Sequence, residues 1–460
     1  MLRLKRLIFV MLIRDIRHFR RVLREFFERE NWVALDTETT AKREFEGQKN
    51  ATLIHGRHEP LTLQLCQKGV SYTAATNRLI PGCPTTAEYV EVLQEMEAEF
   101  AQPWWVMHNA NYDLRVLRDL GWFPMPENVW DTMLGCWQAD ANAEKGLKAR
   151  APRLGRFIRD TKTVDMNNVE ELSNYGESDV IVTDELYQMQ VFSRIVRPPI
   201  LRHLRADGKY VDTKNPQTVL DLVVESEKLS DFDRFYLMNL EFPLVKTTLD
   251  IEFNGMPYDK AAMKVLREKL LTDYEACKKQ IFQTFKKVIN LNSGDQLVAE
   301  LQRLGIRLTR KTEKGKLSVN VEALLHLKGA HPVIDMLLNY RKLEKLLSVY
   351  MGEDGLDSFY NPETGCIHAT LNQCAAVTGR YSAQQPNLQQ LPARKDTYGI
   401  RSVVRVAGTI APPKPKVTSG IVLGEAPTPS PKKPVMLKPP VKRQVAVKPL
   451  KIQKLTVKSK

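Results

Sequence analysis

Residues 32–40 read WVALDTETT, an apolar run followed at once by two carboxylates. The run Trp32 to Leu35 predicts a buried β-strand that ends on Asp36. Glu38 follows two positions later, and side chains at i and i+2 of a strand point to the same face. One strand can therefore present two carboxylates to a single site.

Two later segments each add one carboxylate at a helical spacing. Asp113 ends HNANYD, four residues after Asn109, and Asp179 ends YGESD, four residues after Tyr175. Residues four apart lie on the same face of a helix. Taken alone, each motif is also typical of a solvated loop, a helix cap or an ordinary helix face. Their order after a buried strand favours one shared site, in which Asn109 fixes the strand-to-helix turn or contacts the substrate.

Four clustered carboxylates suit phosphodiester hydrolysis with two divalent cations. Such cations, about 3.5–4 Å apart, activate a water and stabilise the leaving oxygen. Mg²⁺ takes oxygen ligands, and packed carboxylates resist ionisation without a cation. The pattern predicts a nuclease in which Tyr175 orients the attacking water. The predicted ligands of two Mg²⁺ or Mn²⁺ ions are Asp36, Glu38, Asp113 and Asp179.

Strands and helices alternate along the first 205 residues. Leu61 to Leu65 alternates like a second strand, and Trp104 to Met107 is an apolar strand that leads to HNANYD. Thr85 and Glu88 have the spacing of a capping box at a helix start. The pattern predicts an α/β domain with a mixed central sheet, in which carboxylates at strand ends and helix starts converge on one edge.

The second half of the chain has a helical pattern. A long helix is predicted from Ala261 to Val288 and another over about 331–351, after a turn at Asn254-Gly255-Met256-Pro257. Residues 365–371 resemble a strand. This half is therefore mainly helical, with a small amount of β-structure near its end.

The carboxylate motifs resemble those of the DEDD superfamily of 3′–5′ exonucleases, in the subclass with tyrosine in the third motif. The resemblance covers about residues 13–200, through LDTETT, HNANYDLRVL, VWDTML and YGESDVIVTDEL. It implies an RNase H-like fold and release of nucleoside monophosphates. By position it implies that both LDTETT carboxylates and Asp179 bind the catalytic metal. Asp36 and Asp113 would bind the second metal, and Tyr175 would hold the water.

A second resemblance, to family A DNA polymerases, begins near Glu241. EFPLVKTTLDIEFNGMPYD looks like the segment entering the polymerase thumb, and TGRYSAQQPNLQQLPAR, residues 378–394, matches a motif of that family. The resemblance implies that Arg380, Asn387 and Gln389 face the minor groove of primer–template DNA. Minor-groove acceptors are nearly independent of sequence, so donors there test pairing geometry.

The family pattern stops after Ile400-Arg401. An Asp-Tyr-Ser strand, a fingers helix with nucleotide-binding Arg and Lys, and a His-Asp-Glu segment should follow, and the sequence contains none of them. DNA-directed DNA polymerase activity is thus implied by the resemblance only, and we do not expect it from this chain alone. A separate chain carrying palm and fingers, a truncated product, and an exonuclease that kept a thumb as a duplex clamp are the alternatives.

The basic character of the chain is concentrated at its C-terminal end. Residues 412–460 hold 12 of the 68 Lys and Arg but one of the 54 acidic residues, and so carry +11 of the net charge of +14. This Pro-, Lys- and Val-rich composition predicts disorder. The tail is expected to tether the chain to DNA or to its missing half, with a solvated spacer as the alternative.

These observations predict five successive regions: an exonuclease domain (1–205), a linker (206–239), a thumb-like helical region (240–355), the start of a polymerase palm with the TGR motif (356–404) and a disordered tail (405–460).

The expected function is the proofreading 3′–5′ exonuclease part of a family A DNA polymerase in DNA replication, acting on single-stranded 3′ ends and primer–template DNA. One alternative is a non-catalytic primer–template-binding subunit of a split polymerase, and another is an exoribonuclease of the same superfamily. No apolar run approaches the roughly 18 residues of a membrane span. We therefore expect no membrane partner and a cytoplasmic location, in a bacterium or a phage-infected host.

Overall fold

The computed structural model describes residues 11–48, 56–193, 228–392 and 398–404 of the 460-residue chain. The predicted tail (405–460) and residues 206–227 of the predicted linker lie outside the described residues. No helix within the described ranges is both long and apolar enough to cross a bilayer.

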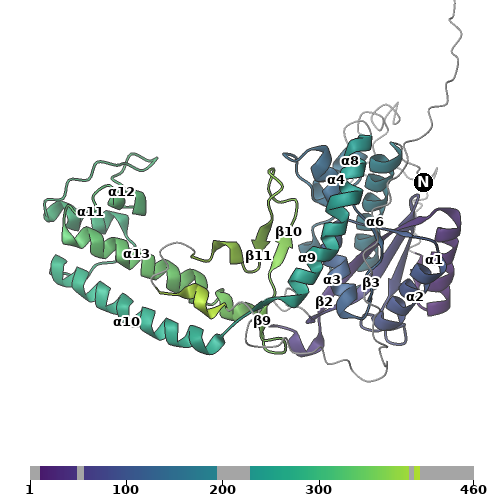
Figure 1. The fold of residues 1–460 in the computed structure, drawn as a ribbon, viewed down its shortest axis with the longest axis horizontal. Helices are drawn as coiled ribbons and strands as arrows, with labels where there is room; N and C mark the ends of the chain where they lie inside the picture. Colours follow the sequence, from purple (N-terminus) through teal and green to yellow (C-terminus); the bar gives the residue numbers. More distant parts are fainter. Residues whose placement is uncertain (1–10, 49–55, 194–227, 393–397, 405–460) are drawn as a thin grey trace, which may run out of the picture. The chain divides into compact units, whose positions relative to one another are not determined.

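A six-stranded sheet with the strand order β1-β4-β3-β2-β5-β6 organises the first part of the chain (Figure 1). The pairs β2–β3 and β3–β4 are antiparallel, whereas β1–β4, β2–β5 and β5–β6 are parallel. The sheet is therefore mixed, and the predicted α/β class is confirmed. The strands are β1 (Leu12–Ile13), β2 (Trp32–Ala41), β3 (His58–Gln67), β4 (Val70–Ala75), β5 (Trp104–Met107) and β6 (Asn128–Asp131).

Strand β2 is longer than the sequence suggested. The prediction that it ends on Asp36 is wrong, because pairing with β3 continues to Ala41, across a register shift between Glu38 and Thr39. The parallel pairing of β2 with β5 stops at Ala34. Both carboxylates therefore lie within a strand, on the part of β2 that extends past its pairs with β5.

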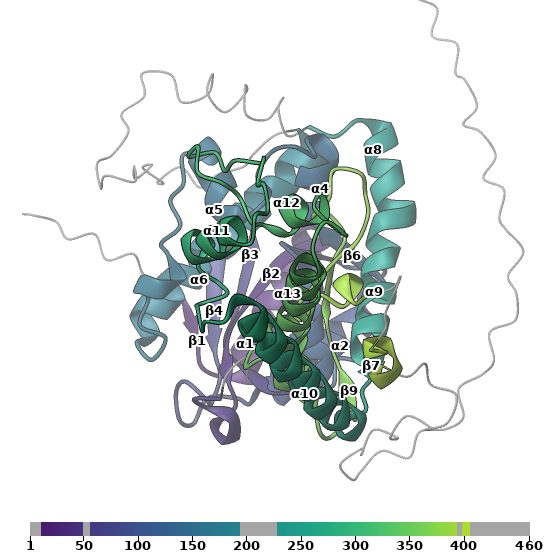
Figure 2. The same ribbon diagram turned by 90° about the vertical axis from the view of Figure 1, so that its left-hand side faces the viewer.

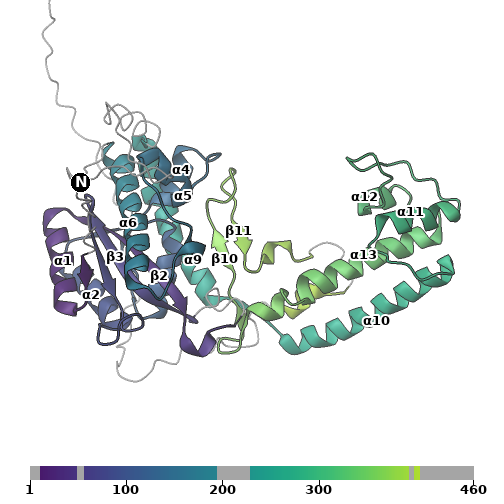
Figure 3. The same cartoon turned by 180° about the vertical axis from the view of Figure 1, so that it is seen from behind.

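Helices cover both faces of this sheet. In Figures 1 and 3, α1 and α2 lie on one face and α6 lies on the other. Helix α2 begins with the predicted capping box between Thr85 and Glu88. The helices of this part are α1 (Ile16–Arg29), α2 (Thr86–Glu99), α3 (Ala110–Asp119), α4 (Thr132–Ala139), α5 (Leu147–Arg150) and α6 (Val169–Phe192).

A second helical stretch packs with the sheet although it comes later in the sequence. Helix α8 (Asp231–Tyr236) continues through a π-helical turn, Leu237–Glu241, into α9 (Phe242–Asn254). Apolar residues of this stretch belong to the same hydrophobic cluster as the strands, and the rings of Phe242 and Trp130 are 4.9 Å apart. The start of the predicted thumb region therefore shares its core with the sheet.

Two long helices dominate the remaining part. Helices α10 (Lys260–Phe285) and α13 (Pro332–Met351) run antiparallel, since Tyr274 stacks on Tyr340 at 5.0 Å while Cys277 contacts Met336. Both helices lie close to their predicted bounds. The connection between them contains α11 (Gly294–Arg303) and α12 (Val321–Leu325), as Figure 2 shows.

Short strands complete the chain. Strands β7 (Met256–Pro257), β9 (Cys366–Ile367) and β8 (Tyr360–Asn361) form one small sheet, and β10 (Thr370–Asn372) pairs with β11 (Ser382–Gln384) in another. The strand predicted over 365–371 is thus divided between two sheets. His368 lies at the division, where its ring hydrogen-bonds to the Glu252 carbonyl and to Thr364, each at 2.8 Å.

Candidate metal centre

Three carboxylates from two elements meet at one point of the sheet. Asp36, Glu38 and Asp179 each offer an oxygen atom, and these atoms lie within 4.8 Å of one another. Asp36 and Glu38 come from β2, as their i, i+2 spacing predicts, and Asp179 comes from α6. Segments separated by about 140 positions in the sequence therefore build one acidic group.

Close packing of α6 on β3 brings Asp179 to this point. Gly176 lies against Gln64 of β3, and a Cβ atom at position 176 would be 2.4 Å from the Gln64 side-chain nitrogen. Gln64 is fully buried and donates to Thr62 Oγ1 at 2.6 Å. The glycine of YGESD thus permits an approach that a larger side chain would obstruct, a role that the sequence did not reveal.

Asp113 lies beside this group and is held by the backbone of β2. Its Oδ1 atom accepts hydrogen bonds from the Thr37 N–H at 3.0 Å and from the Thr37 hydroxyl at 2.6 Å. Thr37 is located past the last β2–β5 pair, so its N–H is directed to a side chain of α3. The structure therefore brings all four predicted carboxylates to the part of β2 that lies past its last pair with β5.

Asp131, which sequence reasoning did not single out, fixes the start of α3. Its buried carboxylate accepts from the backbone N–H groups of Asn109 and Ala110 at 3.0 and 2.9 Å, and caps α4 through Met133 at 2.8 Å. An aspartate directly before a helix start is a usual N-cap. That signal for the start of α4 was present in VWDTML. Nothing in the sequence indicated that the same carboxylate also holds the start of α3.

Asn109 serves the turn through its backbone. It has left-handed geometry with φ of 64° at the start of α3, and its side chain makes no capping hydrogen bond. This conformation is tolerated by asparagine better than by most residues. The predicted role in the strand-to-helix turn agrees with this geometry, and its exposed side chain leaves substrate contact a prediction.

Tyr175 is buried beside Asp179 on α6. Its hydroxyl lies 2.9 Å from Thr161 Oγ1, and Thr161 in turn accepts a hydrogen bond of 3.2 Å from Lys148 Nζ. Tyr175 also precedes Asp179 by one turn of α6, which places both side chains on the same face of the helix. Thr161 and Lys148 were missed, because no periodicity links α5 or the loop at 160–163 to the carboxylates.

Burial and mutual repulsion make ionisation of the four carboxyls unfavourable. Burial, and then the neighbouring carboxylates, raise the pKa of Asp36 and Glu38 well above the usual range. Burial raises the pKa of Asp113 to about 7, against hydrogen bonds from Thr37 that lower it. Burial likewise raises the pKa of Asp179 to about 7, although Tyr175 and the Lys148 charge act in the opposite direction.

This donor set fits a hard divalent cation. Within the described residues, Asp179 Oδ1 is buried and has no hydrogen-bond partner. An unpaired buried acceptor is costly, and a cation would satisfy it and offset the carboxylate repulsion. All the converging donors are oxygens, which Mg²⁺ and Mn²⁺ prefer.

The three predicted duplex contacts lie on other elements. Arg380 and Gln389 are exposed and Asn387 is half-buried, in and after the turn between β10 and β11. Asn387 Oδ1 accepts from the Gln389 N–H at 3.2 Å, and Gln389 Oε1 accepts from the Ala383 N–H at 3.3 Å. Both amide oxygens are thus held within the loop, so each side chain can offer its NH₂ group as a donor.

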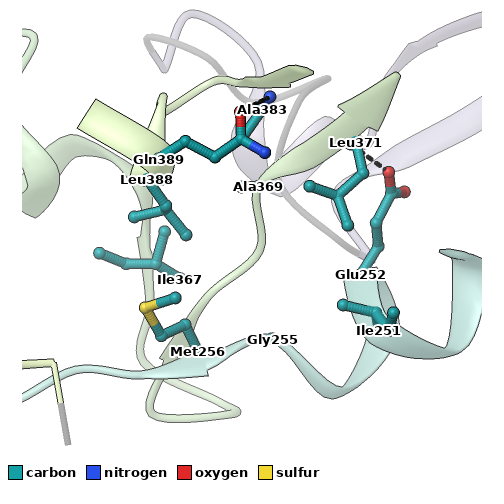
Figure 4. A pocket seen from close by; sticks show the side chains of 10 residues that line it. All are labelled: Ile251, Glu252, Gly255, Met256, Ile367, Ala369, Leu371, Ala383, Leu388 and Gln389. Carbon is teal, nitrogen blue, oxygen red and sulfur yellow. Dashed lines mark hydrogen bonds between the residues drawn. The ribbon is translucent and has the colours of Figure 1, made fainter. Parts of the chain in front are cut away.

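An apolar cavity of about 220 Å³ lies under this loop (Figure 4). Ile251, Met256, Ile367 and Leu388 form its walls, and Gln389 lies at its edge with the hydrogen bond to Ala383. The cavity therefore lies between the end of α9, the small strands and the loop that carries Asn387 and Gln389.

Comparisons with a family model and with known proteins agree in the family to which the chain is similar. A family model described as DNA polymerase family A matches residues 260–410. The thermostable DNA polymerase I of Thermus thermophilus is 37% identical over 286 residues, which are 59% of this chain and 33% of that protein. DNA polymerase I of Chloroflexus aurantiacus is 29% identical over 314 residues, which are 67% of this chain and 31% of that protein.

A solved structure has a similar fold. The POL domain of Pol1 from M. smegmatis, in complex with DNA primer-template and dNTP, aligns with a TM-score of 0.57 at 21% identity, covering 84% of this chain and 56% of that chain. The chain spans about a third of the length of the two DNA polymerase I relatives named above. In its segment 260–410, and through the two relatives named above, the chain is similar to the family A DNA polymerases.

Proposed function

We propose that this chain is the 3′–5′ proofreading exonuclease part of a family A DNA polymerase, acting in DNA replication on the 3′-terminal nucleotides of DNA. In this proposal residues 1–205 form an RNase H-like exonuclease domain. The observation that carries it is the meeting of Asp36, Glu38 and Asp179 within 4.8 Å, with Asp113 fixed beside them by Thr37.

The carboxylates would hold two divalent cations, Mg²⁺ or Mn²⁺. Asp36, Glu38 and Asp179 would bind one, and Asp36 and Asp113 the other. Two such cations, when bound, supply an activated water and stabilise the leaving oxygen of a phosphodiester. The fit is supported by the raised pKa values, which make a charged site depend on cations.

Tyr175 would orient the attacking water. Its hydroxyl lies 2.9 Å from Thr161 Oγ1, and Asp179 is one turn further along the same helix. Burial raises its pKa above the ordinary value, so the hydroxyl stays protonated and acts as a donor and acceptor of hydrogen bonds. A fixed hydroxyl at this place can hold a water in line with the scissile bond, which is a matter of orientation more than of proton transfer.

The later part of the chain would hold the duplex. We propose that the helical region 240–355 acts as a thumb and that 356–404 begins a palm, with Arg380, Asn387 and Gln389 donating to the minor groove. The solved relative that contains primer-template DNA supports this assignment. The linker 206–239 and the tail 405–460 complete the proposed organisation.

A single gel tests the proposal. The protein is incubated with a 5′-labelled primer annealed to template, with Mg²⁺ and all four nucleotides. Stepwise shortening that is lost in Asp36→Ala would establish the exonuclease. Extension would contradict our expectation that these 460 residues do not polymerise. An unchanged primer would contradict the exonuclease.

A second candidate function is duplex binding without catalysis, as a subunit of a split polymerase completed by a separate chain. The ordered amide groups of Asn387 and Gln389 favour it. A native gel shift of primer–template that is unaffected by Asp36→Ala, without shortening, would support it. An exoribonuclease of the same superfamily is the third candidate, and faster shortening of RNA than of DNA ends would support that.

A further inference from the structure

A line of hydrogen bonds connects the surface of the protein to the buried hydroxyl of Tyr175. Lys148 Nζ donates to Thr161 Oγ1 at 3.2 Å, and Thr161 Oγ1 lies 2.9 Å from the Tyr175 hydroxyl oxygen. Lys148 and Thr161 are exposed, whereas Tyr175 is buried. The line thus begins in solvent and ends at the residue proposed to orient water.

The hydroxyl of Thr161 links the two hydrogen bonds of this line. The Lys148 ammonium group can only donate, so Thr161 Oγ1 accepts from it. Between Thr161 and Tyr175 either hydroxyl can be the donor. In both arrangements the Thr161 oxygen takes part in both hydrogen bonds, and linked hydrogen bonds polarise and strengthen one another.

The local structure holds the backbone of Lys148 and of Thr161. Lys148 is located in α5, which is anchored by the buried Arg150, and Leu147 of that helix packs against the cluster that contains Tyr175. Thr161 opens the short helical turn Thr161–Thr163, which Asp160 caps through the Lys162 N–H at 3.2 Å. Both residues that lead to Tyr175 therefore start from ordered backbone.

We propose that Lys148 and Thr161 are positioning residues for the exonuclease reaction: they hold the Tyr175 hydroxyl in the orientation that places the attacking water. The inference rests on the proposed function and deepens it. Neither residue need touch the DNA, since both act through Tyr175. Lys148 also pairs with Asp160 at 3.5 Å, a surface contact that contributes little to stability.

The kinetic test uses a 5′-labelled single-stranded DNA and Mg²⁺, with rates measured at increasing protein. Thr161→Val and Lys148→Met should each lower the rate constant at saturation by about 10- to 100-fold, because small misplacements of positioned groups are costly. The half-saturating concentration should stay unchanged. Thr161→Ser and Lys148→Arg should restore most of the rate, and Lys162→Met, a neighbouring exposed lysine, is the control.

A double substitution separates positioning from other roles. Residues that act through one another are not additive. In a Tyr175→Phe background, Thr161→Val should therefore have little further effect. Full additivity, or a change confined to the half-saturating concentration with a stronger salt dependence, would show direct DNA contact and overturn the inference.

A metal-free measurement keeps the inference separate from the proposed function. The 14 tyrosines are labelled with ¹³C at Cζ, and the signal lost in Tyr175→Phe is assigned to Tyr175. Thr161→Val should shift this one signal in EDTA, because its hydroxyl loses a hydrogen bond. An unmoved signal overturns the inference even if the wild type degrades DNA. If Thr161→Val shifts the signal but the wild-type protein degrades no DNA, the proposed function is overturned, and with it the role of Lys148 and Thr161 in the reaction.

Discussion

The side-chain amide of Asn111 donates a hydrogen bond of 2.9 Å to the buried carboxylate of Glu252, which lies 141 positions later in the sequence. The same Glu252 oxygen accepts from the Leu371 N–H at 2.5 Å (Figure 4). Asn111 is two residues before Asp113 on α3, and Leu371 is in β10. One carboxylate therefore joins the helix α3 of the candidate metal centre, α9 and the hairpin that carries the TGR motif.

Replacing Glu252 by leucine should lower the free energy of unfolding by about 1–3 kcal/mol, because it leaves two partly buried donors without this acceptor. Urea unfolding followed by circular dichroism measures this. Asp250→Asn, on the exposed side of the same helix, is the matched control and should change stability by no more than about 0.5 kcal/mol. A Glu252→Leu protein as stable as the control would show that the junction adds nothing.

The metal-free protein should lose stability as the pH rises. The folded-state pKa values of Asp113 and Asp179, each about 7, lie above the ordinary value of 3.8. Between these values the folded state binds more protons than the unfolded state, so the free energy of unfolding falls with increasing pH. In EDTA, the urea midpoint should therefore be lower at pH 8 than at pH 5.

Removing one of these carboxyls tests the origin of that pH dependence. Asp179→Asn should reduce the fall between pH 5 and pH 8, because the amide does not titrate. The substitution Glu91→Gln, at an exposed position on α2, provides the comparison. Equal slopes in both variants would place the pH dependence elsewhere in the molecule.

Divalent cations should stabilise the folded protein, and this stabilisation should require the Asp36 carboxylate of β2. Adding Mg²⁺ or Mn²⁺ at 100 times the dissociation constant should raise the free energy of unfolding by about 2.7 kcal/mol. Thermal unfolding should show this as a higher melting temperature. Asp36→Asn should abolish the cation-dependent increase, because Asp36 is shared by both proposed metal positions. A cation response that persists in this variant would locate the binding elsewhere.

Gly176→Ala should separate α6 from β3. The new Cβ would meet the buried side chain of Gln64 at 2.4 Å, and such overpacking typically costs about 1–3 kcal/mol. Since Asp179 is one helical turn further along α6, cation affinity should fall together with stability. Isothermal titration with Mn²⁺ measures the affinity.

A second glycine substitution provides the control for this prediction. Gly294→Ala adds a methyl group whose nearest neighbour is 3.9 Å away, so it should leave both stability and cation affinity nearly unchanged. If Gly176→Ala behaves like Gly294→Ala, the close approach of α6 to β3 does not limit the site.

The carboxylates could be predicted because periodicity governs them. The i, i+2 spacing places Asp36 and Glu38 on one face of β2, and the i, i+4 spacing places Tyr175 and Asp179 on one face of α6. The meeting of Asp179 with the other two carboxylates depends on the packing of α6 on the sheet, which no spacing rule supplies. The supporting residues follow no such rule. Thr161 contacts Tyr175 from a short helical turn, and Lys148 contacts Thr161 from a four-residue helix. These elements are too short for a repeating pattern to mark the two positions.

Long-range packing was equally invisible in the sequence. Phe242 and Leu249 share a core with the sheet, although their segment resembles the entry to a separate helical region. Local patterning identifies α9 as a helix, but its apolar face does not specify the partner. The end of β2 was misjudged for a related reason, since pairing with β3 continues through Asp36 and Glu38 despite their charge.

The unequal pairing of β2 on its two sides creates a ledge. On one side, β3 pairs with β2 as far as Ala41 of β2. On the other side, the pairing of β5 with β2 ends at Ala34 of β2. The backbone of β2 that β5 leaves unpaired includes the Thr37 N–H, which donates to the Asp113 carboxylate. The location of the acidic centre is thus set by a difference in strand length. A longer β5 that paired with β2 as far as Thr37 would compete for the N–H that Asp113 accepts from, with every carboxylate still in the sequence.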